Sequence, residues 1–455
     1  MGNIPLLLCS SLFMALALLY FKRKWPDLDV IDIFIIFVVL YFGVYPFIRG
    51  LYVGKGVVYD SANNNPWAIG LVYLQIILIT VIIRVVSLYL PDHIKNYVKL
   101  KTLVEQWARV DKTVVLLFSG LLILFQLISY YKYGVKSHIL PDDFAKIGKD
   151  LPYWLTSGRT IYNYLTLSVV IVFASKASLS RKLTRYYWIA AIILFLPFVG
   201  YFGRKGFVNA VVMAALVWLI NNEKKLFQIK NLAIIASLVL AFFIASNLYQ
   251  TYRSNLQVVG VSLLRLENPI TSALNFKETL KNLGERAGTW EFNYLVFDRQ
   301  MRDPGTGMTN GKITREGLKS ATPRILWPGK KFQTPPEILA EAFNAQQIDV
   351  SFGTNLFGIA QADFGYLSMI TVPLTILLIM IIMASLMKVT FNHPVFFWFL
   401  SVTVLYPLVN IEENGPEIFF MMRNIIAIMT LFLSYLLVNK IIINGSGKEI
   451  TSPSP

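Results

Sequence analysis

The sequence predicts an all-α polytopic membrane protein, and its composition and its apolar runs support that prediction. The chain has 455 residues, of which 55% are hydrophobic and only 15% are charged. A typical soluble domain carries about 25% charged residues. The mean hydropathy is +0.56. This composition excludes both a water-soluble globular fold and a disordered chain.

About eleven segments are long and apolar enough to span a bilayer, which requires roughly 20 residues each. The expected spans are 3–21, 31–48, 67–90, 113–131, 160–176, 186–203, 206–220, 229–248, 365–387, 395–411 and 417–440. We therefore expect transmembrane helices 1–8 within residues 1–248 and helices 9–11 within residues 365–443. A large external segment, 249–364, separates the two groups, and residues 444–455 form a cytoplasmic tail.

Basic residues at the ends of the spans predict the orientation. Lys22, Arg23 and Lys24 directly follow the first apolar run, and no basic residue precedes it. Because positive residues stay on the cytoplasmic side, we expect the N-terminus outside and the C-terminus in the cytoplasm. The same rule accounts for the net charge of +16 without a nucleic acid as partner. The first run has its charges at the wrong end for a signal peptide.

Several classes of site are excluded by missing residues. The single cysteine, Cys9, excludes an internal disulfide and a cysteine-based metal cluster. The chain also lacks a Walker sequence, a GxGxxG before a helix, a GxSxG and a His/Cys metal spacing. We therefore expect no metal and no cofactor, and we consider cytoplasmic nucleotide chemistry excluded.

The external segment 249–364 carries most of the polar residues that lie outside short turns. Long segments of this kind are usually functional. We expect a compact cap of short helices, at 275–287, 290–301 and 336–347, with Pro336 in a first helical turn. Seven of its thirteen basic residues are arginines. Guanidinium groups bind phosphate oxygens bidentately, although ordinary salt-bridged surface helices would also contain them.

Two external motifs hold basic residues in a constrained backbone. Gly203-Arg204-Lys205-Gly206 joins two spans with no room for a loop, so a helix N-terminus and two cations form a plausible anion site. The alternative is that both cations reach outward to lipid phosphates. Pro323–Lys331 contains two prolines that restrict Arg324 and Lys330. In that segment, Trp327 is placed to stack on a sugar ring or to lie at the membrane interface.

Charged residues near span ends complete the set of candidates. Glu412, Glu413 and Glu417 lie together in the last external turn, where carboxylates are suited to general acid or base catalysis. Arg423 follows inside the last span, where ionisable groups are often functional; a solvated turn with Arg423 reaching outward is the alternative. We expect Arg84 to extend to the cytoplasmic interface and Asp32 to begin a helix.

Three stretches resemble the oligosaccharide repeat-unit polymerases of bacterial surface polysaccharide synthesis, the Wzy-type O-antigen polymerases. Gly203–Gly206 is similar to the family's short turn between two helices. Pro323–Lys331 is similar to its Pro-Arg-x-x-Trp-Pro-x-Lys-Pro segment, except that Lys331 replaces the last proline. Thr354–Leu367 is similar to its segment that ends in Asp/Asn-Phe-Gly as the chain re-enters the membrane.

The resemblance implies a membrane-embedded glycosyltransferase, of the GT-C type, in the bacterial inner membrane. Its substrate would be an undecaprenyl-pyrophosphate-linked oligosaccharide, used to build O-antigen for lipopolysaccharide or a related polysaccharide. A chain-length regulator and a flippase would be its partners. The growing glycan would pass to a sugar hydroxyl of a lipid-linked repeat unit at the outer face of the membrane.

The chemistry of that transfer predicts the site residues. Fixed cations stabilise the charge that develops on a pyrophosphate leaving group. The candidate pyrophosphate ligands are Arg204, Lys205, Arg286, Arg315, Arg324, Lys330 and Arg423. A carboxylate suffices to accept the proton of the hydroxyl, and Glu285, Glu417 and Asp363 are the candidate catalytic residues.

Two other functions are compatible with this layout. An O-antigen ligase has a similar arrangement of spans, but that family depends on a histidine in the large external segment, and none occurs within 249–364. A lipid-linked oligosaccharide flippase or transporter is the alternative of another class. Transporters often show repeated halves and charged, broken helices near the bilayer centre, whereas here the charges cluster at one face.

Overall fold

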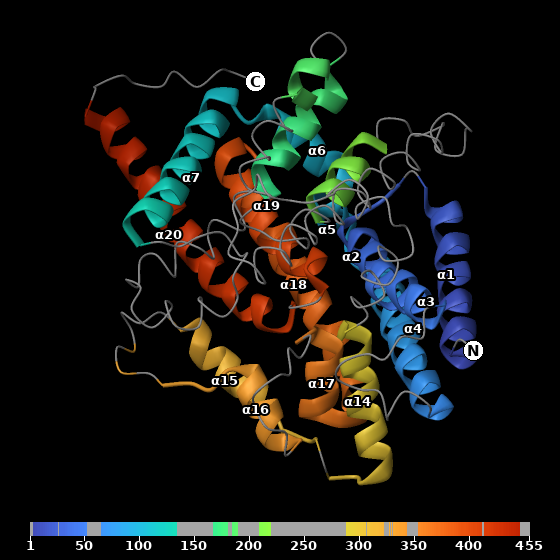
Figure 1. The fold of residues 1–455 in the computed structure, drawn as a ribbon. Helices are drawn as coiled ribbons and strands as arrows, with labels where there is room; N and C mark the ends of the chain where they lie inside the picture. The colour runs from blue at the N-terminus through green and yellow to red at the C-terminus, as the bar shows by residue number, and fades with distance from the viewer. Residues whose placement is uncertain are drawn as a thin grey trace, which may run out of the picture.

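The computed structural model describes residues 3–25, 27–51, 65–133, 167–180, 184–189, 209–219, 288–305, 307–322, 327, 329, 331–343, 354–411 and 414–445. These residues are overwhelmingly helical, and no strand is found among them. Figure 1 shows the long helices side by side, with the shorter helices α14 to α17 gathered at one end. This part of the prediction, an all-α protein, is confirmed.

Five helical stretches among the described residues are long and apolar enough to cross a membrane. They are Ile4–Lys24, Val30–Leu51, Pro66–Leu88, Leu356–Thr390 and Gly415–Lys440. Shorter apolar helices lie at Lys112–Leu121, Leu167–Leu179, Asn209–Leu219 and Pro394–Val409. The chain therefore has the build of a polytopic membrane protein. The expected span 229–248 and most of the expected span 186–203 lie outside the described residues.

The N-terminal helices begin where polar caps meet apolar runs. Asn3 caps α1 (Ile4–Lys24), and Asn65 caps α4 (Pro66–Leu88), which has proline in its first turn. Asp29 and Asp32 form a reciprocal capping box at the start of α2 (Val30–Val39), as we predict for Asp32. A π-helical turn, η1 (Leu40–Val44), joins α2 to α3 (Tyr45–Leu51). The short helices α5 (Asp92–Val98) and α6 (Leu100–Arg109) lead into α7 (Lys112–Tyr133).

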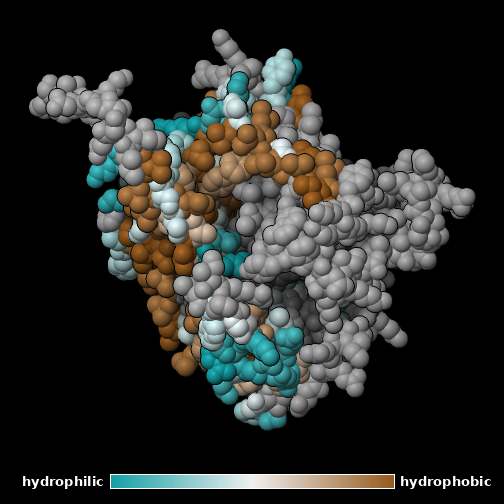
Figure 2. All heavy atoms as spheres, turned by 90° about the vertical axis from the view of Figure 1, so that its left-hand side faces the viewer, coloured by the Kyte–Doolittle hydropathy of each residue, from teal (hydrophilic) through white to brown (hydrophobic). Residues whose placement is uncertain are grey.

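One large hydrophobic core joins the N-terminal and C-terminal helices, and a second, smaller cluster lies among α14 to α17. The central helix α18 (Ser368–Thr390) packs against α4, α5 and α19 (Pro394–Val409), and α19 packs against α20 (Asn414–Gly445). The fully buried Trp107 donates a hydrogen bond from its indole nitrogen to the Ser401 hydroxyl at 2.7 Å. The outward faces of the long helices are strongly apolar, with residues such as Leu18, Val81 and Leu431 largely exposed. Figure 2 shows a hydrophobic band above a hydrophilic lower end, as expected of a lipid-facing belt.

The described part of the segment 249–364 forms short helices. They are α14 (Gly288–Arg302), α15 (Lys312–Ala321), α16 (Pro335–Ala342) and α17 (Leu356–Phe364). The helix predicted at 290–301 is thus observed. The helix predicted at 336–347 is observed as far as Ala342, with Pro336 in its first turn as predicted, and residues 344–347 lie outside the described residues. Helix α15 was not predicted, and the predicted helix 275–287 lies outside the described residues.

Helix α17 is part of the bundle rather than of a polar cap. The ring of Phe357 lies 6.1 Å from the ring of Phe34 and 5.3 Å from that of Phe42, measured between centroids. The chain therefore re-enters the hydrophobic core at 356, before the predicted start of the span at 365. Gly365, with φ of 56°, then separates α17 from α18 through the 3-10 turn η4 (Gly365–Leu367).

Candidate functional site

Asp363 begins the Asp-Phe-Gly sequence of the motif Thr354–Leu367, and its carboxylate is buried, with 2% of the residue exposed. Four donors surround it. The Thr309 hydroxyl and the Ile313 amide (3.1 Å) donate to Oδ1. The amide and the hydroxyl of Thr314 both donate to Oδ2 at 2.7 Å. Every favourable accepting position of this carboxylate is thus occupied.

These contacts make Asp363 the N-terminal cap of a helix distant in sequence. The residue before α15 is Gly311, which has φ of 77° and no side chain to bond the free amides of the first turn. Asp363 supplies the missing acceptor for the amides of Ile313 and Thr314. The Gly311 amide also donates to the Asp363 carbonyl at 3.1 Å. In this arrangement Asp363 positions α15 and has no accepting position left for a substrate proton.

Helix α15 packs against α20, which carries two other candidates. Gly317 lies so close to the Phe419 ring that a Cβ at Gly317 would overlap it. Glu417 lies in the first turn of α20. Arg423 is half-buried, its guanidinium carbon lies 5.2 Å from the centroid of the Phe420 ring, and it makes no ion pair with any described residue. The structure thus brings α15 beside the start of the last helix.

The remaining described candidates are solvent-accessible. The Arg315 side chain on α15 is 67% exposed, and its Nε lies 3.6 Å from Glu316 Oε1. Trp327 is 46% exposed. An exposed arginine and an exposed indole are available to a ligand, and both belong to the segment that runs from α15 toward Lys331. The other candidates, Arg204, Lys205, Glu285, Arg286, Arg324 and Lys330, lie outside the described residues.

An ion pair joins α15 to α16. Lys312 on α15 contacts Glu341 on α16 at 2.7 Å, and this hydrogen bond, with a second from Gln333, lowers the pKa of Glu341. Within α15, Lys319 contacts Glu316 at 2.6 Å and lowers the pKa of Glu316 in the same way. Helix α15, which precedes Pro323, is therefore attached to its neighbours through both a buried cap and a surface ion pair.

A chain of side-chain amide groups connects α14 and α17 to α4. Gln361 on α17 donates to Gln300 on α14 at 2.8 Å. Gln75 on α4 donates to the Gln361 side-chain oxygen at 3.0 Å and to the Ser368 hydroxyl at 2.8 Å. Asn65, which precedes α4, donates to Asp298 on α14 at 3.1 Å. Helix α14, and α17 with its candidate Asp363, are therefore attached to α4 by directional bonds as well as by apolar packing.

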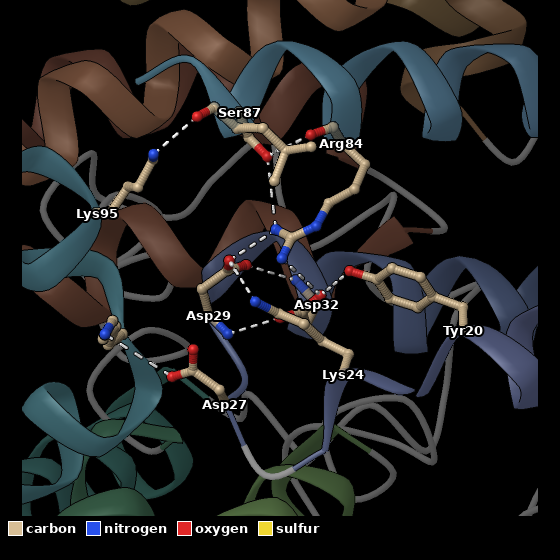
Figure 3. Close-up of polar contacts among 10 residues, drawn as sticks. Tyr20, Lys24, Asp27, Asp29, Asp32, Arg84, Ser87 and Lys95 are labelled. Atoms are coloured by element: carbon tan, nitrogen blue, oxygen red, sulfur yellow. Dashed lines mark hydrogen bonds and ion pairs between the residues drawn. The ribbon is translucent and has the colours of Figure 1, made fainter. Parts of the chain in front are cut away.

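A second charged cluster lies around Arg84, and the prediction that Arg84 extends to the interface is wrong. Its side chain is only 15% exposed, and Nη1 donates to Asp29 Oδ2 at 2.7 Å. Nη2 lies 4.0 Å from Oδ1 of Asp32, whose side chain is fully buried. The Tyr20 hydroxyl donates to the same Asp32 oxygen, and Lys24 lies 4.0 Å from Asp29 (Figure 3). Arg84 is thus paired within the protein, because two nearby carboxylates stabilise its guanidinium group more than water at the membrane interface would.

The positions of these charged residues in the sequence also indicate such a cluster. Asp29 and Asp32 are spaced as a helix cap, and alternation of the spans puts the start of the second span and the end of the third at the same membrane face. Residues 29, 32 and 84 are therefore expected at one end of the bundle. Only the packing of α1, α2 and α4 shows that their side chains meet.

Comparisons with protein-family models, with curated proteins and with solved structures found no match to this chain.

Proposed function

We propose that this chain is a polysaccharide polymerase of the bacterial inner membrane that uses lipid-linked donors. It transfers a growing glycan from undecaprenyl pyrophosphate onto a sugar hydroxyl of a lipid-linked repeat unit at the outer face. In this proposal about eleven spans form a GT-C-type bundle with its N-terminus outside and its C-terminus in the cytoplasm. The product is O-antigen or a related surface polysaccharide.

The observation that carries the proposal is the attachment of α15. Asp363, from the motif similar to the polymerase re-entry segment, caps α15 through the amides of Ile313 and Thr314. Helix α15 leads directly into the Pro323–Lys331 motif and packs on α20. Two motifs that resemble the same family are thus connected, and they adjoin the helix that carries Glu417 and Arg423. This supports one site assembled from segments distant in sequence.

The proposed reaction breaks the bond between the anomeric carbon of the glycan and the pyrophosphate oxygen. A hydroxyl of the acceptor sugar forms the new glycosidic bond and loses its proton to a carboxylate. Arg324, Arg204 and Arg423 bind the departing pyrophosphate, because fixed cations in a poorly hydrated site stabilise its charge. Since the Asp363 carboxylate already accepts four hydrogen bonds, the proton acceptor is Glu417 or Glu285.

Reconstitution tests this proposal. The purified protein in liposomes, given lipid-linked repeat units and no nucleotide, is expected to produce a ladder of longer glycans. Arg324→Ala and Arg204→Ala are expected to lower the rate about 10²–10³-fold, in line with the loss of one anion-binding donor. Arg109→Ala, an exposed arginine on α6, is the control and should elongate normally. Normal elongation by both site variants would contradict the assignment of Arg324 and Arg204 as pyrophosphate ligands.

The Arg84 cluster favours a second candidate, a flippase for lipid-linked oligosaccharides. An ion pair that involves a charged residue of a candidate span, as in Arg84–Asp29, and a helix interrupted as at Gly365 are features also found in transporters. Under this alternative the same liposomes would move the substrate across the bilayer without elongating it. Arg84→Ala would then abolish that movement, whereas the polymerase proposal expects Arg84→Ala to act only through stability.

A further inference from the structure

A cavity of about 420 Å³ lies between the last turns of α1 and α4 and the short helix α5. Pockets for small ligands are of this size, roughly 300–1,000 Å³. The first turn of α4 adjoins α14 through Asn65, so the cavity lies at the other end of this helix, away from the proposed transfer site. Its polar lining consists of Lys24, Asp27, Asp29, Arg84, Ser87, Asp92, Lys95, Asn96 and Lys99.

The walls of the cavity are held in place by backbone contacts. Asp29 and Lys99 form an isolated antiparallel bridge, and the Leu100 amide donates to the Leu28 carbonyl at 3.0 Å. The Lys95 ammonium donates to the Leu88 carbonyl at 2.7 Å and so closes the end of α4. These bonds fix α5 against the start of α2 and the end of α4. The cavity is therefore a defined space rather than a gap between mobile ends.

Three lysines line this space, and two of them make no direct hydrogen bond with the residues that the structure describes. Lys24 Nζ lies 4.0 Å from Asp29 Oδ2, and Lys99 Nζ lies 3.9 Å from Asp27 Oδ1. Both distances exceed that of a hydrogen bond. The third, Lys95, lies 3.4 Å from Asp92 in addition to its bond to the carbonyl. The Lys24 and Lys99 ammonium groups thus keep donors for a ligand, and Figure 3 shows Lys24 beside Asp29.

The carboxylates of the cavity are of two kinds. Asp29 is bound to Arg84, and its side chain is only 17% exposed. Asp27 and Asp92 also line the cavity, and their side chains are 67% and 93% exposed, so their oxygens are accessible from solvent. Positive and negative groups are therefore nearly balanced. This balance favours a ligand that carries both charges over a simple anion.

The rim of the cavity is apolar on the side of α4. Leu88, Leu90, Val98 and Met380 complete the lining. Leu88 is 62% exposed, and the adjoining Tyr89 is 84% exposed, at the end of an apolar helix long enough to cross a membrane. Tyrosine is enriched at the interface between lipid and water. A ligand with a charged head and acyl chains would therefore place its chains along α4.

We propose that this cavity binds the phosphoethanolamine headgroup of a membrane phospholipid. The phosphate lies on Lys24 and Lys99, which supply charge-assisted hydrogen bonds. The primary ammonium lies toward Asp27 and Asp92, to which it donates hydrogen bonds. A quaternary ammonium has no N–H to donate, and a glycerol headgroup has no positive charge, so phosphatidylcholine and phosphatidylglycerol bind less well.

Native mass spectrometry of the delipidated full chain tests this site. Phosphatidylethanolamine, phosphatidylcholine and phosphatidylglycerol with identical acyl chains are titrated separately. We expect phosphatidylethanolamine to bind about tenfold more tightly than either of the others, and Lys24→Ala or Lys99→Ala to remove about tenfold in affinity, as one hydrogen bond to a charged group does. Lys22→Ala, an exposed lysine on the same helix that does not line the cavity, should bind normally.

A second variant tests the ammonium half of the headgroup. Asp92→Asn removes an exposed carboxylate and should reduce the preference for phosphatidylethanolamine over phosphatidylglycerol while leaving the fold intact. Equal binding of the three lipids, or an equal loss of affinity in Lys22→Ala, would overturn the proposal. Soluble phosphoethanolamine that competes as strongly as the lipid would instead show a free phosphate ester as the ligand and would overturn the lipid source.

Discussion

Asp363 illustrates how a charged residue in a motif acquires a structural role. A buried carboxylate is costly unless every accepting position is used. Here four donors from the Thr309–Thr314 stretch meet one carboxylate, and two of them are amides of the first turn of α15. Asp363, a candidate proton acceptor by its place in the motif, thus caps α15, the helix that precedes the Pro323–Lys331 motif.

The first prediction concerns this anchor. Asp363→Asn replaces one oxygen by an amide group that is itself a donor and that faces donors. We expect the free energy of unfolding to fall by about 2–4 kcal/mol, because buried hydrogen bonds to a charged group are lost. Thermal unfolding in detergent measures this effect. Asp92→Asn, on an exposed aspartate, is the control, and an unchanged melting temperature for Asp363→Asn would contradict the cap.

Arg84 provides the second prediction at this scale. Arg84→Ala leaves Asp29 and the fully buried Asp32 without their guanidinium, and breaking a buried pair typically costs about 3–5 kcal/mol. We therefore expect a large loss of thermal stability. The double variant Arg84→Ala with Asp29→Asn should recover part of it, because one uncompensated charge is gone.

The exposed Arg109→Ala is the matched control for Arg84→Ala. If the two single variants melt at the same temperature, the Arg84 cluster does not stabilise the bundle.

At the scale of elements, the start of α20 depends on close backbone packing. A Cβ on Gly415 would lie 2.7 Å from the Thr354 carbonyl oxygen and would overlap the Ile359 side chain. The Gly415 amide donates to the same carbonyl at 3.2 Å. The last helix is thus joined directly to the segment that begins α17, and it is joined through backbone atoms that have little freedom to move.

The third prediction follows from that packing. Gly415→Ala should destabilise the protein by about 1–3 kcal/mol, because it overpacks against backbone atoms. Gly120→Ala is the matched control, since nothing lies within 4 Å of its Cβ and it replaces glycine within α7. That variant should be stabilising by about 0.5–1 kcal/mol. Melting temperatures that shift in the same direction in both variants would contradict the close contact.

The fourth prediction concerns pH and the pairing of α15 with α16. The pKa of Glu341 is lowered in the folded protein by hydrogen bonds from Lys312 and Gln333. A group with a depressed folded pKa contributes stability above its unfolded pKa, about 4.3, and loses that contribution as the pH falls through the folded value. Glu341→Gln should therefore lower the melting temperature at pH 6 but hardly at pH 3.

The exposed Glu105 on α6 provides the control for this comparison. Glu105→Gln should have the same small effect at both pH values. A difference between wild type and Glu341→Gln that persists unchanged at pH 3 would show that the ion pair with Lys312 is not its cause.

At the scale of the whole molecule, the polar ends lie on either side of an apolar belt. Helices α14 to α16 lie at one end, and α5 and α6 lie toward the other (Figure 1). The proposed function requires the end with α14 to α16 to face outward. Orientation is therefore the property on which the transfer proposal depends most.

The fifth prediction tests this orientation. In a Cys9→Ser background, Gly305→Cys should react with a membrane-impermeant maleimide applied to intact cells, because Gly305 is exposed beside α14. Lys22→Cys, exposed at the end of α1, should react only after the membrane is opened. The reverse labelling pattern would place the segment 249–364 in the cytosol and would contradict the proposed polymerase function.

The sequence alone determined the features that depend on neighbouring residues. Apolar runs gave the long helices, because burial in lipid requires length and low charge. Asp32 was placed at a helix start, and the pieces at 290–301 and 336–347 were recognised as helices, the second of them observed as far as Ala342. Helix α15 was missed because its cap, Asp363, follows it by some fifty positions, and Gly311 gives no local signal.

Only the tertiary structure decided which polar side chains meet. Arg84 pairs with Asp29 rather than with the interface, and Asp363 binds amides instead of being free to accept a proton. Both outcomes depend on partners about fifty residues away in the chain. The energy of a charged group in a low-dielectric interior is set by those partners, so the residue type and its position in a motif do not determine its role.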